Sequence, residues 1–117
     1  MRIATMKEIE RYEAALIHAV KLSWELGQLA ADSNVLLRHN ANEGNLDGAL
    51  AIGLVTANHI QTEWAKAAKE FKQAAYDMTG ENPHPGENDR EFITRLFDME
   101  ANDLHALSLR NGVVWRA

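Results

Sequence analysis

The sequence predicts an all-α protein, an elongated three-helix antiparallel bundle with two long helices and a shorter third. Apolar residues recur at three- and four-residue steps over most of the 117 residues, which is helical spacing rather than the alternation of a strand. Both prolines, the strongest helix breakers, lie in the short stretch 83–85. The length suits one domain, so we expect residues 1–117 to form a single helical domain.

The first helix is expected from Met6 to about Ala41. Thr5 and Glu8 have the spacing of a capping box at its start. Its weak point is the sequence Asp-Ser-Asn at residues 32–34, because these residue types favour caps and turns over helix interiors. A break there would give four helices, and both arrangements stay open at this stage.

The second helix is expected over about Leu46 to Thr79 and the third over about Asp89 to Arg110. Within the second, a seven-residue spacing marks one face through Leu50, Ala57, Trp64, Phe71 and Met78. Gly80 is placed to end that helix in the left-handed conformation. Asn88 and Glu91 form a second capping signature, which opens the third helix.

The predicted helices differ in length, and this difference leaves apolar surface uncovered. At 1.5 Å per residue the second helix is about 50 Å long and the third about 33 Å, so the third cannot reach the turn between the first two. That end is rich in large apolar residues, which a monomer rarely exposes together. We therefore expect a homodimer, with two hairpins packed as a four-helix bundle through Leu36, Leu46, Leu50 and Leu54. Trp115, on the short apolar tail, is a further interface candidate.

Negative charge is concentrated late in the chain. The net charge of −5 disfavours direct binding to nucleic-acid phosphates. Between residues 77 and 103 there are eight acidic residues and two arginines. We expect part of this stretch to dock on a larger protein with a basic surface. The expected docking residues are Asp89, Glu91, Asp98, Glu100 and Asp103.

The composition also bears on the cell compartment. The chain has no cysteine, which excludes disulfides, thiolate metal sites and cysteine nucleophiles and fits a reducing compartment. Its N-terminal residues lack the apolar core of a signal peptide. No apolar run approaches the ~20 residues that span a bilayer. We expect a cytoplasmic protein without a membrane partner.

No nucleophile, base and metal ligands converge in the sequence, so we expect no enzyme, no catalytic or metal site and no cofactor. The strongest contrary observation is a pair of acidic motifs, Glu10 with Glu13 and Glu100 with Asp103. Carboxylates three residues apart on a helix can hold Mg²⁺ against phosphates. The two motifs resemble the ExxE and ExxD pairs of all-α nucleotide pyrophosphohydrolases. The resemblance covers these four residues and implies Mg²⁺-dependent nucleotide hydrolysis.

Taken together, these features favour a non-catalytic interaction protein: a small, acidic helical inhibitor or adaptor that masks a larger, nucleic-acid-binding protein. Small, acidic, cysteine-free proteins of this type are often encoded by phages and mobile elements and include anti-CRISPR proteins, an analogy of type and not of motif. An oligomeric phage or bacterial assembly protein is the first alternative. A Mg²⁺-dependent nucleotide pyrophosphohydrolase is the second.

Overall fold

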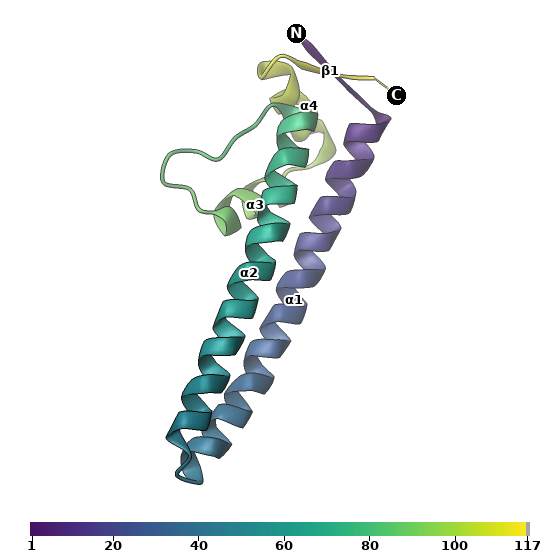
Figure 1. Ribbon diagram of the computed structural model, residues 1–117. Helices are drawn as coiled ribbons and strands as arrows, with labels where there is room; N and C mark the ends of the chain where they lie inside the picture. Colours follow the sequence, from purple (N-terminus) through teal and green to yellow (C-terminus); the bar gives the residue numbers. More distant parts are fainter. Residues whose placement is uncertain (117) are drawn as a thin grey trace. The chain divides into compact units, whose positions relative to one another are not determined.

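The computed structural model describes residues 1–116, and these form four helices and two short strands (Figure 1). The elements are β1 (Arg2–Thr5), α1 (Met6–Asn42), α2 (Leu46–Thr79), α3 (Asp89–Phe97), α4 (Ala101–Arg110) and β2 (Val113–Arg116). The all-α class is confirmed. The residues group into two compact units. We call residues 20–66 the hairpin unit, and residues 1–19 with the chain from 67 onward the core unit.

The first helix begins where the sequence predicts and does not break. The carboxylate of Glu8 accepts hydrogen bonds from the hydroxyl of Thr5 and from its backbone N–H, the latter at 2.8 Å, and these bonds lower the pKa of Glu8. Of the two arrangements left open by the sequence, the continuous helix is correct and the break at residues 32–34 does not occur, because α1 runs unbroken from Met6 to Asn42. Ser33 is buried there, and its Oγ lies 2.7 Å from Oγ1 of Thr56. A hydroxyl with such a partner does not need to bond to its own backbone and disrupt the helix.

A short turn joins α1 to α2 in the hairpin unit. Gly44 has φ +80°, a left-handed conformation that glycine adopts without steric cost. Asn45 follows as the cap of α2: its Oδ1 accepts the backbone N–H of Gly48 at 3.0 Å. The two helices then run antiparallel from this turn (Figure 1).

The core unit is built around aromatic side chains. Phe71 of α2 is fully buried, and its ring centroid lies 5.4 Å from that of Tyr12 on α1 and 5.8 Å from that of Phe92 on α3. The hydroxyl of Tyr12 is buried without a hydrogen-bond partner among the described residues. Burial raises the pKa of this phenol to about 12, since the charged form cannot be solvated there.

The predicted third helix is two helices, so the expectation of one helix over residues 89–110 is corrected. α3 ends at Phe97, and α4 begins at Ala101. In one continuous helix Glu100 would lie one turn after the buried Leu96, and Asp103 would share that face. The break instead leaves Glu100 and Asp103 exposed. Both carboxylates thereby keep their hydration, and burying a charge is costly.

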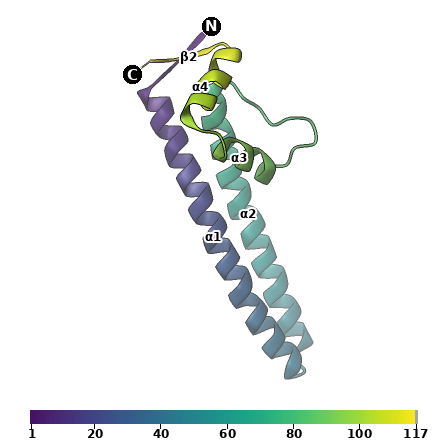
Figure 2. The ribbon, with the colours of Figure 1, turned by 180° about the vertical axis from the view of Figure 1, so that it is seen from behind.

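A two-stranded parallel sheet, which the sequence did not predict, pairs the two ends of the described chain. β1 lies beside β2 in both views (Figures 1 and 2), with Arg2 opposite Val113 and Thr5 opposite Arg116. Strands of four residues carry too few alternating positions for a recognisable pattern. The indole Nε1 of Trp115 donates to the carbonyl of Met78 at 2.8 Å. The tail therefore packs on its own chain.

Candidate protein-interaction surfaces

Five of the eight acidic residues between 77 and 103 bind other groups of the chain. Arg95 binds two of them: its Nη1 lies 2.6 Å from Glu81, and its Nε and Nη2 lie 2.8 and 2.9 Å from the two oxygens of Glu87. The bonds from Arg95 lower the pKa of Glu87 to about 2. Asp77 pairs with Arg11 at 3.6 Å. The bonds from Arg95 hold the loop between α2 and α3. Asp77, Glu81 and Glu87 are thus paired with arginines and contribute little charge to a docking face.

Two of the five predicted docking residues also have structural roles. Asp89 pairs with Lys72 at 2.9 Å. Glu91 completes the predicted capping box of α3: its backbone N–H donates to Asn88 Oδ1 at 2.8 Å, and its side chain accepts the Asn88 N–H at 3.3 Å. Both carboxylates therefore already interact with groups of their own chain and are less available to a partner protein.

The other three predicted residues lie close in sequence at the α3–α4 junction. Asp98 caps the end of α3 through its backbone, Glu100 precedes α4 without a side-chain capping bond, and Asp103 lies in the first turn of α4. All three are exposed, and none forms a salt bridge within residues 1–116. We call Asp98, Glu100 and Asp103 the junction carboxylates.

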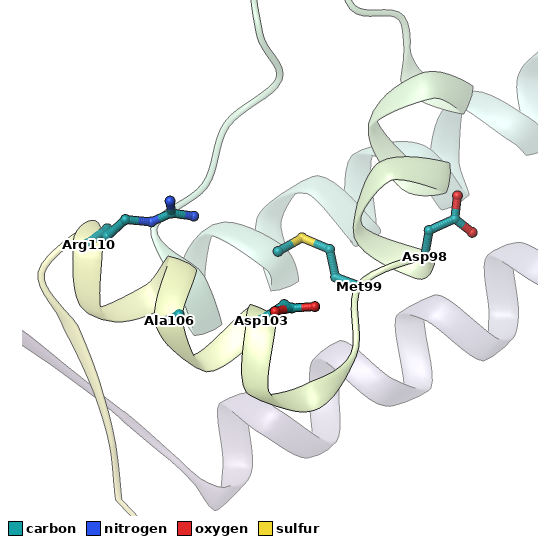
Figure 3. A pocket seen from close by; sticks show the side chains of 5 residues that line it. All are labelled: Asp98, Met99, Asp103, Ala106 and Arg110. Carbon is teal, nitrogen blue, oxygen red and sulfur yellow. The ribbon is translucent and has the colours of Figure 1, made fainter.

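A shallow hollow of about 410 Å³ lies beside the junction carboxylates (Figure 3). The side chain of Met99 lies between Asp98, at the end of α3, and two residues of α4, Asp103 and Arg110. Ala106 completes the lining. The surface therefore combines exposed acidic groups with a small apolar area, a composition suited to a protein partner more than to a small molecule.

The acidic motifs with the hydrolase resemblance do not gather into a metal site. Glu10 and Glu13 are exposed on α1. No group of three or more histidine or carboxylate side chains within the described residues could hold a metal ion. A Mg²⁺-nucleotide site needs carboxylates from more than one element around one point. The sequence resemblance thus gains no geometric support.

The predicted dimer residues are exposed in the hairpin unit, but they occupy two faces. Leu46, Leu50 and Leu54 are 65, 65 and 72% exposed and follow one another at four-residue steps along α2. They form one ridge, which we call the leucine ridge. Leu36 is 55% exposed on α1. It lies two residues, or about 200°, beyond Asn34, and this residue lines the groove described next.

A groove of about 490 Å³ runs along the hairpin unit beside the leucine ridge. The described lining is largely apolar and small: Ala30, Ala31, Ser33, Asn34, Leu37, Gly53, Thr56, Ala57 and Ile60. The groove was not predicted from the sequence, although two of its small residues, Gly53 and Ala57, lie four positions apart on α2. The contribution of Ala30 and Asn34 could not be predicted because it depends on how α1 is rotated against α2.

A further exposed apolar face lies on α1. Trp24 of α1 is 69% exposed. Helical spacing places it on the same outward face as Val20 and Val35, which are 45 and 68% exposed. Tryptophan is enriched among residues that dominate binding energy, so this face belongs with the candidate surfaces.

Comparison with known proteins adds no relative. No family model matches the chain, no curated protein matches it, and no solved structure matches it. None of the helices in the described part is long and apolar enough to cross a membrane. The structure itself defines the fold class: an all-α protein whose two long helices are joined by a short turn.

Proposed function

We propose that the protein is a non-catalytic interaction protein, a small acidic inhibitor or adaptor that binds a larger protein with a basic surface. The observation that carries this proposal is the exposure of the junction carboxylates without internal ion pairs. Charges that the fold does not use remain available to attract a partner of opposite charge. A basic, nucleic-acid-binding protein has a surface of that kind.

The structure supports a narrower docking face than the sequence suggested. Asp98, Glu100 and Asp103 are free to bind, whereas Asp89 and Glu91 already hold Lys72 and the start of α3. Met99 and Ala106 add apolar area beside the free carboxylates. Inhibitors of bacterial defence systems encoded by phages, anti-CRISPR proteins among them, fit this type, and such a role would place the protein in the cytoplasm.

The test compares two double variants with the same change in charge. Asp98→Lys with Glu100→Lys reverses the junction, and Glu10→Lys with Glu13→Lys reverses an exposed acidic pair on α1. Tagged wild-type protein identifies a partner in a host lysate, and association rates with the purified partner are then measured against ionic strength.

We expect association of the wild type to slow steeply with salt, because exposed charges are screened within about 8 Å at physiological ionic strength. The junction variant should associate at least about tenfold more slowly, and the α1 variant should stay near wild type. Equal rates for the junction variant and the wild type would contradict the proposal.

A further inference from the structure

One face of the hairpin unit carries both a ridge and a groove. Leu50 lies three residues before Gly53, and Leu54 lies three residues before Ala57, so the leucine ridge runs directly beside the α2 wall of the groove. The opposite wall comes from α1 through Ala30 and its neighbours. We call the leucine ridge and this groove together the groove face.

The chemistry of the groove face restricts what it can bind. Residues 48–62 of α2 contain no Asp, Glu, Lys or Arg. The two hydroxyls in the groove, those of Ser33 and Thr56, bond to each other. A phosphate, a carboxylate or a basic peptide would find no charge there to replace its hydration. An apolar helix surface fits, because the small residues of the lining let another helix approach closely.

We propose that the groove face binds the groove face of a second copy of this chain. The ridge and the groove lie side by side on one surface, so a two-fold rotation places the ridge of each copy in the groove of the other. The product is a four-helix bundle made of two hairpins.

The size of the surface is consistent with a stable pair. Residues 46–62 extend roughly 25 Å along α2, and two helices side by side are roughly 20 Å wide. A face of these dimensions covers roughly 500 Å², so two copies together would bury roughly 1,000 Å², the area that a specific interface needs to reach. This proposal goes beyond the proposed function, and it is independent of the junction carboxylates.

The geometry changes the expected role of Leu36. Because it lies about 200° around α1 from Asn34 but only three residues after Ser33, Leu36 is at the margin of the groove face and should contact the second copy less than Leu50 does. It is nevertheless an exposed leucine of the same hairpin. Leu36→Asp is therefore a matched control for Leu50→Asp.

The experiment measures the molar mass of the full chain by light scattering and sedimentation at micromolar concentration, with helical content followed by circular dichroism. Wild type and Leu36→Asp should have twice the chain mass of 13.1 kDa. Leu50→Asp should be monomeric and still helical, since Leu50 is 65% exposed within one chain. Ala57→Lys, at an exposed groove position, should weaken self-association by about tenfold or more.

Two results would overturn the proposal. A wild-type mass of 13.1 kDa would show that the groove face is open or belongs to a different protein. A dimer that survives both Leu50→Asp and Ala57→Lys but dissociates with Leu36→Asp would place the interface on the other flank. If Leu50→Asp loses helical content, the molar mass of Ala57→Lys decides whether the groove face is the dimer interface. Ala57→Lys should remain folded, because the Ala57 side chain is exposed and lysine favours helix.

Discussion

Substitution of Leu54 by alanine tests the proposed dimer quantitatively, because a two-fold symmetric dimer contains the substitution once in each copy. Leu54 is 72% exposed in one chain, and full burial of a leucine contributes about 1.5–3 kcal/mol. Removing three of its four side-chain carbons should therefore lose about 1–1.5 kcal/mol per copy. The dimer loses about 2–3 kcal/mol, which is roughly a 30- to 150-fold rise in Kd.

Mixed dimers give an internal check on this value. Sedimentation equilibrium over a concentration series yields Kd for the wild type, for Leu54→Ala and for their mixture. A heterodimer contains one truncated leucine, so its binding free energy should lie midway between those of the two homodimers. Leu36→Ala should change Kd less than about threefold. A Leu54→Ala dimer as tight as wild type, or Leu36→Ala as weak as Leu54→Ala, would refute the reasoning.

Three further predictions concern the core unit, the loop and the glycines, each measured by urea unfolding. Phe71→Ala should lower the free energy of unfolding by about 3–5 kcal/mol, and Phe97→Ala, at a side chain 55% exposed, by less than about 1 kcal/mol; similar losses would contradict the core assignment. The pKa of Glu87, about 2 in the folded state against 4.5, means that its stabilisation is present above pH 4.5 and is lost as the pH falls toward 2. The unfolding free energies of wild type and Glu87→Gln should therefore converge over that range, and a constant gap would exclude the Arg95 contact as the cause. Gly80→Ala should destabilise by about 2 kcal/mol, because φ is +72° and the new Cβ would lie 2.8 Å from Cβ of Asn111; Gly27→Ala, in an open helical position, should stabilise by about 0.5–1 kcal/mol, and the same sign for both would be inconsistent with this backbone.

The sequence was sufficient for the features that depend on local spacing. The Asn88–Glu91 capping box and the end of α2 at Gly80 each follow from residues a few positions apart, and both are present. The exposure of Leu50 is also as expected. Patterns of this range are set by backbone geometry, so the printed sequence alone contains them.

The features that the sequence missed depend on contacts between distant residues. The sequence could not decide whether α1 breaks near Ser33, because the hydroxyl that satisfies Ser33 within the helix lies 23 positions away. The break between α3 and α4 has no glycine or proline to mark it. In a continuous helix Glu100 would lie one turn after Leu96, and the burial of Leu96 is not visible in the sequence. The hydrogen bond from the indole of Trp115 to the carbonyl of Met78 joins residues 37 positions apart. For the acidic face, sequence reasoning could list the carboxylates but could not tell which of them Arg95 and Lys72 would neutralise.

The hydroxyl pair in the groove also sets the alignment of α1 against α2. A hairpin lined by alanine and glycine offers few distinct knobs, and its helices could slide past each other with little change in apolar contact. A slide of one turn, about 5.4 Å, would separate Ser33 from Thr56, which lie 2.7 Å apart. The hydroxyl of Ser33, which is buried, would then lack a partner, at about 1–3 kcal/mol. The polar pair thus favours one register of the hairpin, as buried asparagines do in coiled coils, and it acts together with the contact between Tyr12 of α1 and Phe71 of α2.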